Sequence, residues 1–169
     1  MKNTLLLAFA LIVLSMWGRV NIPTPRPIEP QITPPLRTER PFELKGTFQT
    51  NETKEVTTTG ANVTAGGQGQ ASQVGQFSFR YDGQINSLDG SRISKLHLVA
   101  LNGESLYAEG IGQELHTPNS DVVTVIEVYH FTGGTGWLTN ASGTFTVQRQ
   151  LNIRTGATSG RFEGFILIP

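Results

Sequence analysis

The sequence contains no cysteine, which excludes disulfide bonds, thiolate metal ligands and a cysteine nucleophile. It has little charge, because only 15% of its residues are charged against roughly 25% in an average globular protein. It also lacks an excess of one sign, with 13 basic and 13 acidic residues, so no nucleic-acid partner is expected. No stretch after residue 42 keeps helical spacing over three turns. These absences favour a small β protein.

Proline and glycine divide the 169 residues, a length typical of one domain, into unlike parts. Residues 1–41 hold seven of the nine prolines and a single glycine, Gly18, whereas residues 42–169 hold the other 18 glycines. Charge divides in the same way: the first part has five basic and two acidic residues, and the second has 8 and 11. We therefore expect a basic leader attached to a mildly acidic domain.

The leader consists of two segments. Lys2 precedes a largely apolar run from Leu5 to Trp17, which fits the centre of a secretory signal peptide and is shorter than the ~20 residues that span a bilayer. Residues 1–18 are predicted to be a signal peptide or, uncleaved, a short membrane anchor. The proline-rich residues 19–41 favour an extended polyproline II linker. The sequence thus predicts a secreted, periplasmic or cell-envelope protein whose membrane contact is limited to an uncleaved leader.

The domain at residues 42–169 alternates between apolar and polar residues with period two. Phe77, Phe79 and Tyr81 share one face of such a run, and Asn102-Gly103 is a strong hairpin signal. Glycines recur inside the strand patterns, as the bent strands of a barrel require. We predict an all-β domain, a single antiparallel eight-stranded barrel, in which the polar residues 51–68 form a mobile loop or weak edge.

One segment carries a resemblance. Residues 131–147 read FTGGTGWLTNASGTFTV, and residues 160–166 read GRFEGFI. With the upstream GQFSFRYDG, they resemble the barrel superfamily of allene oxide cyclases and plant dirigent proteins, and look most like its small exported bacterial members of unknown function. The resemblance covers about residues 64–168 and implies an eight-stranded barrel with an apolar interior, often oligomeric in the plant members. The catalytic residues of the plant enzymes have no match here, so it implies no activity.

The turns of this segment give a physical reason for its glycines. Gly133, Gly134 and Gly136 are expected to reverse the chain through positive φ angles, and Asn140–Gly143 to re-enter the sheet without a side-chain clash. Gly143 therefore joins the other three as a structural turn residue. The GGTG sequence lacks the GK[ST] continuation of a phosphate-binding loop.

Glu127 and Tyr129 are candidate catalytic residues, because they share one face of the strand at residues 121–131. If that face points inward, a carboxyl and a phenol lie in an apolar cavity, where the carboxyl can act as a general base. If it points outward, Val122, Ile126 and Val128 form the core. The outward orientation is favoured, because a β-branched set is the less costly core.

Tyr107 and Glu109 repeat this pairing on residues 105–113, and His97 lies on the adjacent hairpin strand. An inward Glu–Tyr–His set would suit an isomerase or lyase acting on an apolar substrate, but cross-strand pairing on the outer wall is favoured. The three histidines have no paired-ligand spacing, so no metal and no cofactor are expected. The candidate ligand-binding residues are Phe77, Phe79, His97, His130 and Trp137.

Three functions remain open. The first, which is favoured over an enzyme, is an exported, non-catalytic barrel that binds a small apolar ligand or a partner protein and can form homo-oligomers. The second is a cyclase or isomerase acting on a lipid-like substrate, and the third is a structural envelope protein. An inward Glu127 or Glu109 beside an open cavity would favour the enzyme. A cavity lined only by Phe, Leu and Val would favour ligand binding, and a filled interior the structural role.

Overall fold

The computed structural model describes residues 41–168 apart from residues 117 and 119, so the predicted leader and all of the linker except Pro41 lie outside the described residues. The described chain is all β apart from one short 3-10 helix, η2. Its elements are β1 (Pro41–Val56), β2 (Gly60–Ala71), β3 (Gly75–Asn86), β4 (Ser91–Ala100), β5 (Ser105–Leu115), β6 (Val122–Gly134), η2 (Gly136–Leu138), β7 (Ser142–Asn152) and β8 (Ala157–Leu167). No helix among the described residues is long and apolar enough to cross a membrane.

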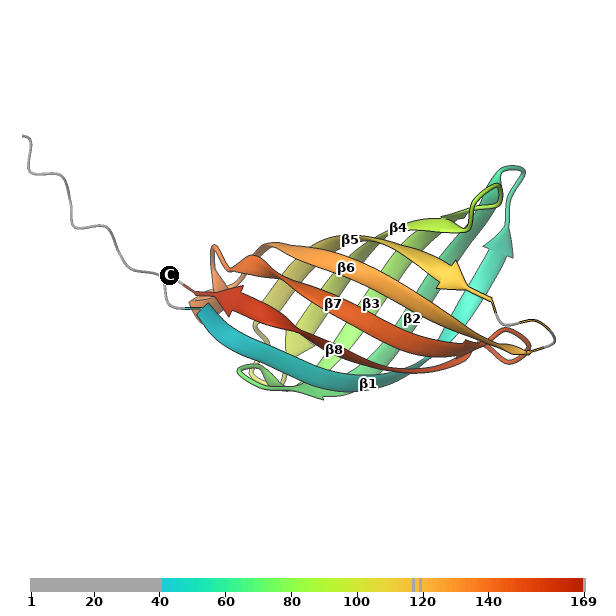
Figure 1. Cartoon of the computed structure of the whole chain (residues 1–169). Helices are drawn as coiled ribbons and strands as arrows, with labels where there is room; N and C mark the ends of the chain where they lie inside the picture. The colour runs from blue at the N-terminus through green and yellow to red at the C-terminus, as the bar shows by residue number, and fades with distance from the viewer. Residues whose placement is uncertain (1–40, 117, 119, 169) are drawn as a thin grey trace, which may run out of the picture. The chain divides into compact units, whose positions relative to one another are not determined.

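The eight strands form one closed barrel in which each strand pairs antiparallel with the next in sequence. The barrel closes where β8 pairs with β1, from Pro41 opposite Leu167 to Asn51 opposite Ala157. Figure 1 shows this closure as the cyan start of β1 beside the red end of β8. The predicted eight-stranded antiparallel barrel is confirmed.

The prediction that residues 51–68 form a mobile loop or weak edge is wrong, because most of them belong to two paired strands. β1 continues to Val56 and β2 begins at Gly60, and the two strands pair along this whole region. The inward positions of β2 are occupied by small residues, so the segment shows no stripe of large apolar side chains. The inward residues are Ala61, Val63, Ala65, Gly67, Gly69 and Ala71.

These small residues are needed because large side chains lie directly opposite them on neighbouring strands. Gly67 pairs with Phe79, and a Cβ atom at Gly67 would lie 2.8 Å from the Phe79 ring. Gly110 of β5 pairs with Tyr129 of β6, and a Cβ atom there would lie 2.6 Å from that ring. The inward glycines therefore make room for aromatic side chains inside the closed barrel.

The apolar core fills the end of the barrel at which β1 begins and β8 ends. Leu138 of η2 is fully buried there, between the end of β6 and the start of β7. The main core cluster consists of Leu44, Ala71, Phe77, Leu98, Leu106, Ala108, Tyr129, Phe131, Leu138, Ala141, Phe145, Val147, Phe162 and Ile166. Most of these residues also line a cavity inside the barrel.

Candidate functional site

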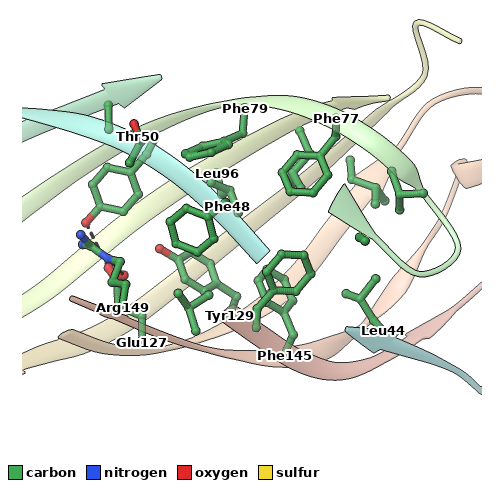
Figure 2. Close-up of a pocket in the computed structure, with 18 of the residues that line it drawn as sticks. Leu44, Phe48, Thr50, Phe77, Phe79, Leu96, Glu127, Tyr129, Phe145 and Arg149 are labelled. Carbon is green, nitrogen blue, oxygen red and sulfur yellow. Dashed lines mark hydrogen bonds and ion pairs between the residues drawn. The ribbon is translucent and has the colours of Figure 1, made fainter. Parts of the chain in front are cut away.

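A cavity lies inside the barrel, lined by inward-facing residues of the strands (Figure 2). It offers about 50 Å³ to the centres of water-sized groups. One water needs roughly 10–15 Å³ by this measure, so the space admits a compact molecule of about one ring or a short alkyl chain. Figure 2 shows Leu44 at one end of the cavity and Arg149 with Glu127 at the other.

The wall between these ends is aromatic. Phe48 and Phe79 meet edge to face with ring centroids 5.4 Å apart, and Phe145 stacks on Tyr129 at 5.1 Å. Phe77 and Phe162 extend the wall, with their centroids 6.0 Å apart. Such contacts hold aromatic side chains in defined orientations, so this part of the cavity has a specific shape as well as an apolar surface.

At the other end, Glu52, Glu127 and Arg149 line the cavity. Together with Arg92 and Glu114, which pack next to them without lining it, they form what we call the interior charge cluster. All five side chains are no more than 8% exposed. Arg149 bonds Glu127 through Nε, with 2.9 Å between Nε and Oε2, and bonds Glu52 through Nη1. Arg92 pairs with Glu114, and its Nη1 lies 3.8 Å from a Glu52 oxygen. Glu52 therefore links two arginines that come from different strands.

Glu127 is the most deeply buried carboxyl of this cluster, with 1% of its side chain exposed. The Tyr81 hydroxyl donates to its Oε1 at 3.0 Å, and Arg149 Nε donates to its Oε2. Burial raises the pKa of Glu127, and the opposing effects of the Arg92 charge and of hydroxyl hydrogen bonds do not cancel this shift. Both carboxyl oxygens thus have partners, while the group retains a proton more readily than an exposed glutamate.

Burial also shifts the pKa values of other ionisable groups at this end of the cavity. It lowers the pKa of Arg149 to about 10. It raises the pKa of Tyr81 and of Tyr129, and the nearby Glu127 charge adds to both shifts. Tyr129 shares a 2.8 Å hydrogen bond with Ser94. Both phenols therefore stay protonated and act as hydrogen-bonding hydroxyls.

Two buried N–H groups of the cluster, Arg92 Nε and Arg149 Nη2, have no hydrogen-bond partner within the described part of the chain. Arg149 lines the cavity, whereas Arg92 does not. A buried donor without a partner is unfavourable, because it has lost its hydrogen bonds to water. One of the two unused donors therefore belongs to a side chain that lines the cavity.

The favoured outward orientation of Glu127 and Tyr129 was wrong. Both side chains are 1% exposed and point into the barrel, while Val128 is 49% exposed on the outer wall. β-Branched residues favour strands whichever side they face, so they did not identify the core of β6. The core residues of β6 are Val123, Val125, Glu127, Tyr129 and Phe131.

The other pair of catalytic candidates lies on the outer wall, as favoured. Glu109 pairs with Lys95 at 3.2 Å, and Tyr107 stacks on His97 with ring centroids 4.8 Å apart. His97 also hydrogen-bonds Ser105, with 3.0 Å between Nε2 and Oγ. The structure therefore does not bring these residues together with Glu127, and no inward Glu–Tyr–His set is formed.

The five candidate ligand-binding residues separate in the same way. Phe77 and Phe79 line the cavity. His130 is exposed on the outer wall of β6, in register with Glu109 of β5. Trp137 is 46% exposed in η2. Neither His130 nor Trp137 lines the cavity, and the same holds for His97.

The turn glycines follow the expected conformations with one exception. Gly133 and Gly136 have the expected positive φ angles of 139° and 61°. At Gly143, where the strand re-enters the sheet, a Cβ atom would lie 2.4 Å from the Phe165 carbonyl oxygen, so the absence of a side chain is required as expected. Gly134 does not have a positive φ, so that expectation was wrong for this residue. Glycine is required there by close approach, since a Cβ atom would lie 2.6 Å from the Leu138 carbonyl oxygen.

Sequence reasoning missed the partners of Glu127, namely Tyr81, Arg149 and the rest of the charge cluster. One signal was present. Arg149 continues the alternating apolar positions of Phe145 and Val147, and Arg92 stands in phase with Leu96 and Leu98. A charged residue in phase with an apolar face, repeated on several strands, indicates a buried ionic layer.

Neither metal binding nor family membership adds to this description. Over residues 41–168, leaving out 117 and 119, no group of three or more His, Asp or Glu side chains is placed to hold a metal ion. No protein-family model matches the chain, and no curated protein matches it. The function must therefore be argued from the cavity and the charge cluster themselves.

Proposed function

We propose that this protein is an exported barrel that binds a small apolar molecule in its interior. The observation that carries the proposal is the cavity between Leu44 and Arg149, whose surface is almost entirely apolar. Small-molecule sites are typically concave and apolar with a few polar groups at defined places. Here the charge cluster supplies those polar groups at one end.

Exposure of the inward side chains supports the proposal. Phe48, Phe79, Leu96 and Ala65 all line the cavity and face the interior of a closed barrel, yet each is only partly buried. They border space that no protein atom fills, and atoms that line a void lose dispersion contacts. A ligand of matching shape restores those contacts, which favours its binding.

Export is part of the same proposal and rests on residues 1–18 and on the linker at residues 19–41. In this arrangement the barrel acts in the periplasm, the cell envelope or the medium. Because it has no cysteine, its stability there comes from sheet closure and core packing, without disulfide bonds. Ligand capture outside the cytoplasm is the activity we assign to it.

A matched pair of cavity variants tests this function. Ala65→Leu adds three carbon atoms inside the cavity, whereas Thr64→Leu enlarges an exposed neighbour on the same strand. We expect native mass spectrometry of protein from its own host to show a bound small molecule in the wild type and in Thr64→Leu, and little in Ala65→Leu. Equal occupancy in all three proteins would place the ligand elsewhere, and no ligand in any of them would contradict the proposal.

A second candidate function, isomerase- or cyclase-like chemistry on an apolar substrate, is favoured by one observation. Glu127 faces the cavity, and its pKa is raised by burial. A carboxyl tuned in this way is suited to general acid–base catalysis. Its two oxygens are already engaged by Tyr81 and Arg149, which is why we place ligand binding first.

This second candidate has its own test. Purified protein is incubated with a lipid extract of the host, and the extract is compared by untargeted mass spectrometry. An enzyme would produce new products with the wild type and with Glu109→Gln, the matched variant on the outer wall, and none with Glu127→Gln. Identical extracts for all three proteins would exclude catalysis on the lipids present.

A further inference from the structure

The unpaired nitrogen of Arg149 belongs to a side chain that lines the cavity, so the chemistry of a ligand atom that reaches it is specified. Arg149 is 4% exposed and lines the cavity, and its other two nitrogens are used by Glu127 and Glu52. Nη2 has no acceptor within the described part of the chain. The ligand atom that satisfies it must accept a hydrogen bond, because a guanidinium nitrogen can only donate.

The charges around Arg149 restrict this acceptor further. The interior charge cluster contains three carboxyl groups and two guanidinium groups, all largely shielded from solvent. An anionic ligand would bring its charge beside Glu52 and Glu127, the two carboxyl groups that already contact Arg149, at a high desolvation cost. A cationic ligand would present a donor to a donor. A neutral oxygen is the acceptor that fits both conditions.

Size and surface define the rest of the ligand. The remaining wall is formed by aromatic and aliphatic side chains, and the free space suits about one ring or a short alkyl chain. We infer that the cavity binds a small, uncharged apolar molecule that carries a carbonyl-type oxygen, which accepts a hydrogen bond from Arg149 Nη2. This inference rests on the proposed ligand-binding function and specifies its ligand class.

Three probes of similar size test the inference on the full-length protein by calorimetric titration. Acetophenone carries a ketone oxygen, α-methylstyrene replaces that oxygen with a methylene group, and benzoate carries a negative charge. We expect acetophenone to bind about tenfold more tightly than α-methylstyrene, as one hydrogen bond to a charged donor provides. Benzoate is expected to bind more weakly than acetophenone.

The outcomes separate the inference from the function on which it rests. If α-methylstyrene binds as tightly as acetophenone, the cavity binds apolar molecules and the inferred acceptor is wrong. If benzoate binds most tightly, the restriction to neutral ligands is wrong. If none of the three binds, the proposed function fails together with the inference.

A variant and a spectroscopic measurement locate the hydrogen bond. In the triple variant Arg149→Met, Glu52→Gln, Glu127→Gln, which removes Arg149 together with its two carboxylates, we expect the preference for acetophenone to disappear while α-methylstyrene still binds. In the wild type, acetophenone should shift the ¹⁵N resonances of the Arg149 guanidinium, and α-methylstyrene should leave them nearly unchanged. A preference retained by the variant, or unchanged resonances with bound ketone, would overturn the assignment to Arg149. The resonance measurement does not depend on the folding of the variant.

Discussion

The interior of the barrel is apolar around Leu44 and Phe145 and charged around Arg149, although the same eight strands build both regions. In the apolar region any side chain of similar volume and shape can replace another at modest cost, because dispersion and hydrophobic contacts are not directional. In the charged region each group needs particular partner atoms, and the cluster draws its five side chains from five strands. The apolar region therefore sets the size of the cavity, and the charged region fixes how the strands meet around it.

Removal of one member of the charge cluster is expected to have the largest effect. Arg149→Met leaves Glu127 and Glu52 without their shared partner, and breaking a buried ion pair costs about 3–5 kcal/mol of unfolding free energy. The triple variant Arg149→Met, Glu52→Gln, Glu127→Gln should regain most of this loss, because no carboxylate is then left unpaired. Urea denaturation followed by circular dichroism measures both values. A triple variant as unstable as the single one would show that packing of the arginine stem, and not charge, dominates.

Replacing a large side chain by a small one in the apolar region should lower the unfolding free energy by a similar amount. No second substitution that removes a charge can restore this loss. Phe145 is 4% exposed and contacts Tyr129, Phe131 and Phe162, so Phe145→Ala is expected to lose about 3–5 kcal/mol. Phe165→Ala, on the next strand but 42% exposed, is the matched control and should lose far less. The same denaturation experiment applies. Equal losses for the two variants would contradict the inward orientation of Phe145.

The pairing of small with large inward residues predicts a smaller loss of stability on substitution of an inward glycine, and no loss at the outward glycine beside it. Gly67→Ala would place a Cβ atom 2.3 Å from the Gln49 carbonyl oxygen of β1 and 2.8 Å from the Phe79 ring of β3, and overpacking of this kind costs about 1–3 kcal/mol. At Gly66 the nearest atom to an added Cβ is 3.7 Å away, so Gly66→Ala should be neutral or slightly stabilising. Thermal denaturation of both variants checks this. Equal melting temperatures would argue against the close packing of β1 and β3 around Gly67.

The smallest predicted effect is a pH dependence of the charged region. Because the folded-state pKa of Glu127 is raised, its contribution to stability is fully present below the unfolded pKa of about 4.3 and is lost as pH rises through the folded pKa. A glutamine side chain does not titrate, so the stability of Glu127→Gln relative to wild type should increase between about pH 4 and pH 8. Denaturation at both pH values measures the difference, with Glu109→Gln as the outer-wall control. A relative stability that is flat or decreases with pH would contradict the shift.

The two regions also differ in how far the sequence predicts them. Alternation placed Phe77, Phe79 and Tyr81 on one face, and the Asn102-Gly103 turn between β4 and β5 follows from its residue types, with Gly103 at a φ of 85°. These features depend on neighbours in the chain. Which face of β6 points inward cannot be predicted from neighbouring residues in the chain, because Val122, Ile126 and Val128 on the outer face are as apolar as the residues that face inward.

The charge cluster was beyond local prediction for a related reason. A buried glutamate is tolerated only when its partners are in place, and those of Glu127 lie 46 residues before it at Tyr81 and 22 residues after it at Arg149. Only the register of three strands brings them together. Without that register, exposure to solvent was the less costly expectation for Glu127.

The pairing of β8 with β1 has a consequence for how the chain folds. Pro41 and Leu167 can meet only after the whole domain has been synthesised, so the pairing that closes the barrel joins residues at the greatest separation in sequence. Contacts of this kind carry a large loop-closure entropy and slow the folding of β proteins. Until β8 docks, β1 and β7 have unpaired edges that can join strands of other chains. A chain shortened before Ala157 would therefore be prone to aggregation even though seven strands remain.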